Sequence, residues 1–305
     1  MKISTLLATS ITAFALASAS HGAIIVQELW DAAGSDVTLN GAGDTATSVG
    51  MTGTWATNGT YGTRIFTASN FDIQPLPGLP PQASATGGLY WNTGLGSSWD
   101  TNIYATRELA STISFASTQT LYFSVRMTNR NDTAVGLGLA DGPNGSAQFV
   151  GTGFTWNTAT GLDGTNANNS LYLSAGTLDQ NLTGNNDGPY AILAHTTAGS
   201  IDGAGLVVGR MTLNATGNDL IDLRLYKDGD TIEEDPSTVT WSLQGGVDSS
   251  MEASHLLVWL NGSGWGGESD AIRIGTTWMD VTGVPEPSVA LLGGLGLLGL
   301  LRRRR

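Results

Sequence analysis

The chain has 305 residues, of which 26 are acidic and 13 basic, for a formal net charge of −13, and it contains no cysteine. Such a charge disfavours binding to nucleic acid or to anionic lipid headgroups. The lack of cysteine excludes thiol nucleophiles, thiolate metal sites and disulfide scaffolds, so stability must come from a packed core.

The first 23 residues have the layout of a secretory signal peptide. Lys2 supplies a positive start, and residues 3–16 are largely apolar. Small residues suited to signal peptidase occur at Ala17-Ser18-Ala19 and at Ala23. Cleavage after Ala23 is preferred, because the mature chain would then begin directly with a strand. His21, two residues earlier, departs from the small residue expected there, and a retained N-terminal anchor is the alternative to cleavage.

Residues 24–283 predict one large all-β domain. Short apolar or alternating runs are separated by Gly, Asn, Asp, Ser and Thr, and no stretch suits a long helix. Strands are expected at residues 24–28, 121–127, 136–140, 170–174, 190–195, 205–213, 220–226, 238–243, 255–260 and 271–281. The continuous apolar run 256–260 is typical of a central strand covered on both faces. Four prolines in residues 74–85 predict a surface loop there, with a linker between two domains as the alternative.

Aromatic residues gather in residues 90–104, a stretch that also contains Gly and Ser. A sugar-binding surface needs exposed rings beside hydrogen-bonding groups, and loops often carry such residues. The candidate glycan-binding residues are Tyr90, Trp91, Asn92, Trp99 and Tyr104. Packing over a sheet edge is the alternative for this set, whereas Trp259 and Trp278 lie in expected strands and are expected in the core.

Acidic residues cluster around an Asp-Gly turn after the strand expected at 220–226. Hard cations prefer oxygen ligands, so calcium is the one cofactor that the pattern suggests. The candidate calcium ligands are Asp228, Asp230, Glu233 and Asp235. Their spacing is not that of an EF-hand, and acidic turns are ordinary in an acidic protein, so a turn without a metal is the favoured interpretation.

Candidate catalytic residues are few. Glu268 and Asp270 are two apart and would face the same side if they lie in a strand, and glycoside hydrolysis needs two carboxyl groups across a sugar. His195 and His255 lack the neighbours of a catalytic or metal-binding motif. No Gly-x-Ser-x-Gly elbow for a serine hydrolase is present.

Four segments resemble the laminin-G and concanavalin-A-like jelly rolls: Glu28–Asp31, Gly53–Trp55, Tyr122–Arg126 and Asp270–Trp278. The resemblance implies a two-sheet antiparallel β-sandwich whose first and last strands lie side by side, residues 24–28 beside 272–278. Concanavalin-A-like glucanases carry closely spaced carboxylates on one strand, but their pattern continues with a further glutamate where Ala271-Ile272-Arg273 stands here. No catalytic residue is therefore assigned, and the chain is expected not to be an enzyme.

The last 22 residues combine a proline-rich motif, an apolar run and a basic end. Pro285-Glu286-Pro287, preceded by Val284, must stay outside a helix interior. The uncharged run that ends at Leu301 would span only about 21 Å as a helix, at roughly 1.5 Å per residue, which is shorter than an ordinary transmembrane span. The chain ends with Arg302, Arg303, Arg304 and Arg305, which would lie on the cytoplasmic side.

These features resemble the PEP-CTERM sorting signal, which an exosortase recognises. The resemblance covers only residues 284–305. It implies a Gram-negative cell envelope, transient anchoring in the inner membrane by the C-terminal helix, removal of the tail near the motif, and release or attachment at the cell surface. A plain C-terminal membrane anchor is the alternative.

Together these patterns predict an exported cell-surface or extracellular-matrix protein that is non-catalytic and associates with polysaccharide. The alternatives are a polysaccharide-active hydrolase of concanavalin-A-like fold and a purely structural matrix protein. The expected partners are signal peptidase and exosortase during export and an extracellular polysaccharide afterwards. No nucleic acid is expected as a partner, and the membrane is contacted only through the tail before processing.

Overall fold

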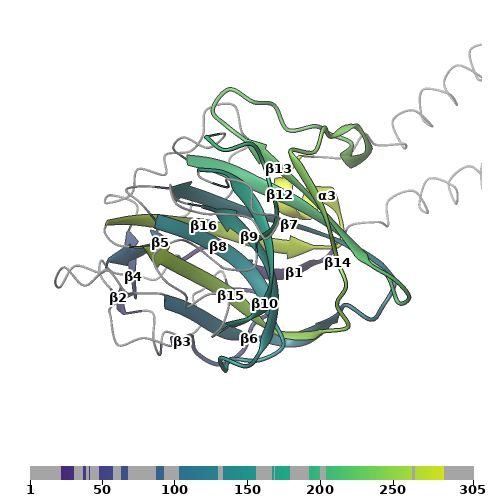
Figure 1. The fold of residues 1–305 in the computed structure, drawn as a ribbon. Helices are drawn as coiled ribbons and strands as arrows, with labels where there is room; N and C mark the ends of the chain where they lie inside the picture. Colours follow the sequence, from purple (N-terminus) through teal and green to yellow (C-terminus); the bar gives the residue numbers. More distant parts are fainter. Residues whose placement is uncertain are drawn as a thin grey trace, which may run out of the picture.

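The computed structural model describes residues 22–30, 37–38, 41, 48–57, 63–67, 87–92, 103–129, 133–155, 167, 169–178, 192–199, 204–262 and 265–284. They form two antiparallel β-sheets packed face to face (Figure 1), which confirms the predicted all-β sandwich. The expected signal peptide, the proline-rich loop and all but the first residue of the expected sorting signal lie outside these residues. Within the described ranges, no helix is both long and apolar enough to cross a bilayer.

Among the described residues, the first sheet has nine strands. Across the sheet they follow the order β14 (Leu243–Val247), β13 (Asp219–Tyr226), β12 (Ala204–Leu213), β7 (Gln119–Asn129), β16 (Trp265–Gly275), β5 (Gly87–Asn92), β4 (Thr63–Thr67) and β2 (Val37–Thr38). β1 (Ile24–Glu28) also pairs with β16, as the predicted pairing of first and last strands requires. β16 therefore has β7 along one edge and two successive partners, β5 and then β1, along the other.

The second sheet has seven strands in the part of the chain that the structure describes. Their order is β11 (Ile192–His195), β10 (Leu171–Thr177), β9 (Gln148–Phe154), β8 (Thr133–Ala140), β15 (Glu252–Gly262), β6 (Ile103–Ser114) and β3 (Ala56–Thr57). The apolar run in β15 lies between β8 and β6, and Leu256 to Trp259 are almost fully buried. The prediction of a central strand covered on both faces is thus confirmed.

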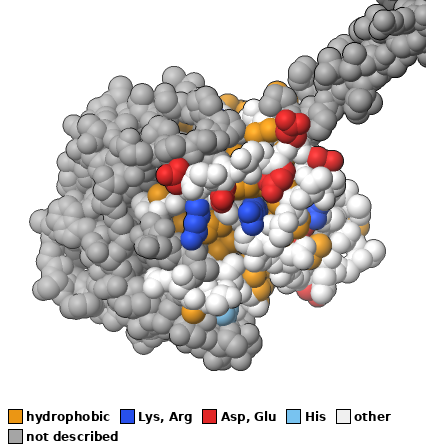
Figure 2. Space-filling view, turned by 90° about the horizontal axis from the view of Figure 1, so that it is seen from above, with side chains coloured by type: hydrophobic (Ala, Val, Ile, Leu, Met, Phe, Trp, Pro, Cys, Tyr) orange, Lys and Arg blue, Asp and Glu red, His pale blue; other side chains and the backbone are white. Residues whose placement is uncertain are grey.

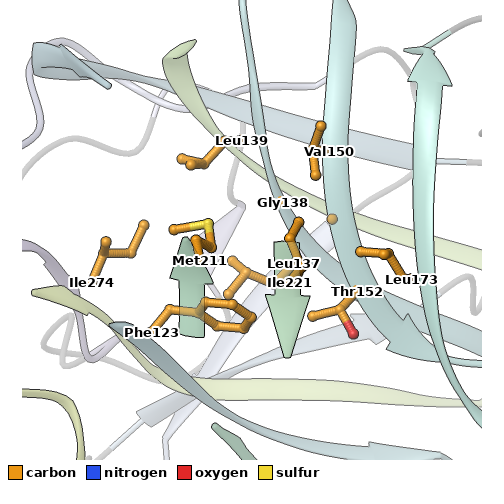
Figure 3. Close-up of a pocket in the computed structure, with 11 residues that line it drawn as sticks. Phe123, Leu137, Gly138, Leu139, Val150, Thr152, Leu173, Met211, Ile221 and Ile274 are labelled. Carbon is orange, nitrogen blue, oxygen red and sulfur yellow. The ribbon is translucent and has the colours of Figure 1, made fainter. Parts of the chain in front are cut away.

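Alternate residues of the two sheets meet in one apolar core. A cavity of about 30 Å³ remains between the sheets, beside Phe123, Leu137 and Met211 (Figure 3). Its lining is apolar apart from Thr152, whose hydroxyl donates a hydrogen bond to the Tyr172 carbonyl oxygen at 2.7 Å. A space of this size with apolar walls is a packing defect rather than a ligand site.

Trp259 packs on the other face of the seven-stranded sheet, against glycine residues of β8 and β9. A Cβ atom at Gly136 or Gly151 would lie 2.1 or 2.5 Å from the indole, so only glycine allows the ring to lie against these strands. The Trp259 Nε1–H donates to the Tyr172 hydroxyl at 2.8 Å, which satisfies its one polar atom. This arrangement confirms Trp259 as a core residue.

Two strand predictions near the C-terminal half are wrong. Residues 238–243 were expected as a strand, but Pro236 begins a 3-10 helix, η2 (Pro236–Thr238), because the Asp235 carboxylate caps it by accepting the Ser237 N–H. The strand expected to continue to residue 281 ends at Gly275, and the helix α3 (Trp278–Thr282) follows. Thr277 and Asp280 form a capping box that starts this helix.

α3 lies over the outer face of the nine-stranded sheet. The Ser124 hydroxyl of β7 donates to the Val281 carbonyl oxygen at 2.7 Å. Trp278 is fully buried, and its Nε1–H donates to the Glu233 carbonyl oxygen at 2.6 Å. α3 and the segment 227–242 thereby bury an apolar cluster on this face, separate from the core between the sheets.

Candidate active site

Three buried charged residues lie together on the outer face of the nine-stranded sheet. Asp270 of β16 is directly opposite Arg126 of β7, and Arg273 is opposite Ser124 two residues away along β7. The exposed fractions of Asp270, Arg126 and Arg273 are only 5%, 8% and 8%. We call these three residues the charged cluster.

A β-bulge separates Asp270 from Arg273. The register of β16 against β7 shifts between these two residues, and Ala271 has a φ of 50°, a left-handed conformation that is rare for a residue with a side chain. The bulge also lies where β16 changes partners, since β5 pairs with residues up to Ser269 and β1 with residues from Ile272 onward. Bulges and strained residues of this kind are concentrated at functional sites, where they re-aim side chains.

Burial dominates the electrostatics of the charged cluster. It raises the pKa of Asp270 to about 7, although a hydrogen bond from the Ala271 N–H at 2.6 Å and the positive charges of Arg126 and Arg273 act in the opposite direction. Burial also lowers the pKa of both guanidinium groups, against the favourable charge of Asp270. The cluster therefore offers a carboxyl group that can gain or lose a proton near neutral pH.

Asp222 of β13, three strands away from β16 in the same sheet, shows the contrasting, structural arrangement. Asp222 accepts hydrogen bonds from Arg210 Nε and Nη2 at 2.9 and 2.5 Å, and from Gln244 Nε2 at 2.6 Å. Within the described ranges, Asp270 has only the hydrogen bond from Ala271, and the buried Arg273 Nε has no partner. Figure 2 looks onto this side of the molecule and shows basic side chains in a row with acidic ones close by. In the described ranges, Asp270 and Arg273 thus retain hydrogen-bonding atoms that no other side chain occupies.

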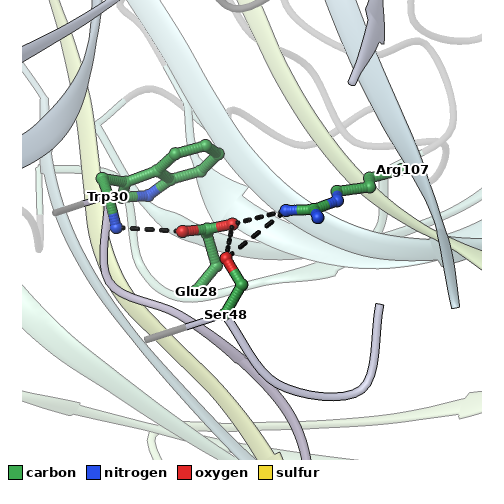
Figure 4. Close-up of polar contacts among 4 residues, drawn as sticks. All are labelled: Glu28, Trp30, Ser48 and Arg107. Carbon is green, nitrogen blue, oxygen red and sulfur yellow. Dashed lines mark hydrogen bonds and ion pairs between the residues drawn. The ribbon is translucent and has the colours of Figure 1, made fainter. Parts of the chain in front are cut away.

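A buried ion pair at the edge of the core joins the two sheets (Figure 4). Arg107 Nη1 of β6 lies 3.1 Å from Glu28 Oε2 of β1, and both side chains are at most 1% exposed. Glu28 also accepts hydrogen bonds from the Trp30 N–H at 3.1 Å and the Ser48 hydroxyl at 3.0 Å. Since these partners occupy the carboxylate, we assign Glu28 a structural role.

The structure describes only one side chain of the two carboxylates, Glu268 and Asp270, that were weighed from the sequence as a catalytic pair and not assigned. Glu268 and Asp270 both lie in β16, opposite Thr128 and Arg126, so their backbone positions share one face as expected. The side chain of Glu268 lies outside the described residues. Sequence reasoning missed Arg126 and Arg273 as members of the site, because only the strand pairing shows that both lie beside Asp270.

The predicted glycan-binding residues are described in part. Tyr90, Trp91 and Asn92 belong to β5, but their side chains, like all of Trp99, lie outside the described residues. Tyr104 is 4% exposed and packs in the apolar cluster of Trp259, so its ring is not presented to solvent. The glycan-binding prediction for the other four residues stays a prediction.

The predicted calcium ligands take part in turn contacts. Asp230 accepts the Lys227 N–H at 2.8 Å, Asp235 caps η2, and Glu233 accepts the Tyr226 hydroxyl at 2.5 Å; Asp228 is exposed. In the part of the chain that the structure describes, no three acidic or histidine side chains converge as a metal site would require. Calcium binding by this turn stays a prediction.

Both histidines of the domain lie in strands and are partly buried, as expected for packed residues. His195 is in β11, where its Nδ1 lies 2.7 Å from the Thr196 carbonyl oxygen. His255 is in β15, where its Nδ1 lies 2.8 Å from the Ser254 hydroxyl, and burial lowers its pKa. Neither belongs to the charged cluster.

No protein-family model and no curated protein sequence matches the chain. Among solved structures, the chain is similar to an engineered GH43 glycoside hydrolase with endo-xylanase and exo-arabinofuranosidase activity, at 13% identity and a TM-score of 0.34 over 81% of this chain and 42% of that one. It is also similar to the endo-β-1,4-glucuronan lyase of the fungus Trichoderma reesei, at 11% identity and a TM-score of 0.35 over 70% of this chain and 94% of that one. A third similar structure is the β-glucanase of Bacillus licheniformis, at 9% identity and a TM-score of 0.36 over 79% of this chain and 98% of that one. The chain thus spans less than half of the first of these structures.

The expectation that the chain is not an enzyme is withdrawn, since the three structures described above are named as a glycoside hydrolase, a lyase and a glucanase. Likeness at this level shows the fold alone and gives this chain no activity. At TM-scores of 0.34 to 0.36, no residue role can be transferred from them. A chemical role must therefore be argued from the charged cluster itself.

Proposed function

We propose that the chain is an exported polysaccharide-active enzyme of the jelly-roll type, in which Asp270 transfers a proton during cleavage of the sugar chain. The observation that carries the proposal is the placement of this buried carboxyl group at a strained bulge of a central strand, beside two buried guanidinium groups. Groups whose pKa is shifted toward neutrality by burial are concentrated at active sites.

Hydrolysis is the reaction that this set of residues supports best. Protonated Asp270 would donate its proton to the oxygen of the glycosidic bond as that bond breaks, and a water molecule would supply the new hydroxyl group and give its other proton to a second carboxylate. A second carboxyl group is required, and Glu268 is the candidate, since positions two apart on a strand are separated by about 7 Å and carboxyl separations of roughly 5 to 10 Å serve glycosidases. Arg126 and Arg273 would donate hydrogen bonds to sugar oxygens or carboxylates.

The proposal is tested by incubating the mature protein with β-glucans, xylan and glucuronan and measuring the release of new chain ends. We expect cleavage of at least one polymer, and a loss of about 10²- to 10⁴-fold in rate for Asp270→Asn, as is typical when a general acid is removed. Asp248→Asn, a change at an exposed carboxylate, serves as the control and should keep the rate. A wild-type protein that cleaves none of the polymers, or an Asp270→Asn variant that keeps its rate, would overturn the proposal.

We also propose that the domain reaches the cell surface through its two terminal signals. A cleaved N-terminal signal peptide and an exosortase-processed tail together account for the positive start, the two apolar segments and the terminal arginines. Replacing Glu286 with alanine, or deleting the four arginines, should leave an unprocessed precursor that immunoblotting detects by its size. Normal maturation of either variant would contradict sorting by an exosortase.

A further inference from the structure

The two residues before β1 are built into the fold. The Ala23 N–H donates to the Thr276 hydroxyl at 2.9 Å, and the Thr276 N–H donates to the Ala23 carbonyl oxygen at 3.2 Å. These contacts extend the β1–β16 pairing one step beyond Ile24 and Gly275. Ala23 thus belongs structurally to the sandwich.

Gly22 contacts the start of α3. A Cβ atom at Gly22 would lie 2.3 Å from Asp280 Oδ2 and 2.3 Å from Thr277 Cγ2, distances at which neighbouring atoms would have to move. Thr277 and Asp280 are the two residues of the capping box of α3. Glycine is therefore the residue that fits between the N-terminal segment and this helix cap.

We infer that signal peptidase cleaves after Ala19, so that the mature chain begins at Ser20 and keeps Gly22 and Ala23. Cleavage after Ala23 would remove both residues and every contact described above. The sequence agrees, because signal peptidase prefers small residues at the first and third positions before the cleaved bond. Cleavage after Ala19 places Ala19 and Ala17 at these positions, whereas cleavage after Ala23 would place His21 at the third. The inference rests on the proposed export of the chain and replaces the preference for Ala23.

The test uses the full chain, expressed in a Gram-negative host, and determines the N-terminal residue of the exported protein by intact mass and Edman sequencing. Two matched variants place a lysine next to each candidate bond. Ala19→Lys should block processing, while Ala23→Lys should leave it unchanged, since the Ala23 side chain is exposed and only its backbone pairs with Thr276.

The possible outcomes separate the inference from the proposed export. An N-terminus at Ser20 with the expected behaviour of both variants supports the inference. An N-terminus at Ile24, or a block by Ala23→Lys alone, overturns the inference and leaves the export intact. A chain that still begins at Met1 overturns both.

Discussion

Replacing Asp270 with asparagine is predicted to stabilise the folded protein at alkaline pH. Burial raises the pKa of Asp270 from 3.8 to about 7, so the folded state holds a proton that the unfolded state has released between those two pH values. The contribution of such a group to stability is fully present below pH 3.8 and is lost as the pH rises through 7. Asparagine has no charge to desolvate, so it avoids this loss.

The expected magnitude follows from the same two pKa values. At about 1.36 kcal/mol for each pH unit, the interval from 3.8 to about 7 corresponds to roughly 4 kcal/mol. The free energies of unfolding of Asp270→Asn and the wild type should be similar near pH 4 and should diverge with rising pH. Above pH 7 the variant should be more stable by up to about 4 kcal/mol.

Urea unfolding of the mature protein at pH 4.5, 6 and 8 measures this difference, with Asp248→Asn as the exposed control. Opposite effects on stability and cleavage would be the signature of a residue kept for function, since active-site groups are often destabilising. The reasoning is refuted if Asp270→Asn is less stable than the wild type at pH 8. It is also refuted if the difference between them does not change with pH.

Two further stability predictions concern buried contacts, and both are measured by chemical denaturation. Arg107→Met should lower the free energy of unfolding by about 3 to 5 kcal/mol, because it leaves Glu28 as a buried charge without its ion pair. The double variant with Glu28→Gln should recover part of this loss. A double variant no more stable than the single one would contradict this account. Gly136→Ala should lower the free energy of unfolding by about 1 to 3 kcal/mol, because the added Cβ would lie 2.1 Å from the Trp259 ring and overpack against it. The control Gly142→Ala, whose nearest neighbour would lie at 3.6 Å, should change little. Equal changes in stability for the two glycine substitutions would show that the Trp259 ring does not require glycine beneath it.

Much of the sandwich could be predicted from residue periodicity. β7, β8, β12 and β13 fall where alternating or continuous apolar runs predicted strands, and the pairing of β1 with β16 followed from the jelly-roll resemblance. β6 and β9 were missed. Their sequences are rich in threonine, serine, glycine or charged residues, and their inward positions become visible only against neighbouring strands.

The candidate active site was less predictable than the fold. Asp270 was a candidate because of its spacing from Glu268, but its burial depends on the strands and on the segments that cover this face. The left-handed Ala271 carries no sequence signal, since alanine rarely adopts that conformation. The association of Asp270 with Arg126 joins residues 144 positions apart, and it exists only because β7 pairs with β16.

The rate of polysaccharide cleavage as a function of pH tests the central claim most directly. The measurement follows kcat/KM between pH 5 and 9 on the polymer that the mature wild-type protein cleaves, in parallel with Asp270→Asn. Because protonated Asp270 is the proton donor, the account predicts that kcat/KM of the wild type falls as the pH rises through an apparent pKa near 7. The variant should be slower by about 10²- to 10⁴-fold and should lack this fall. A wild-type profile without a transition near pH 7, or a variant with the same profile and rate, would contradict the assignment of Asp270 as the proton-transferring group.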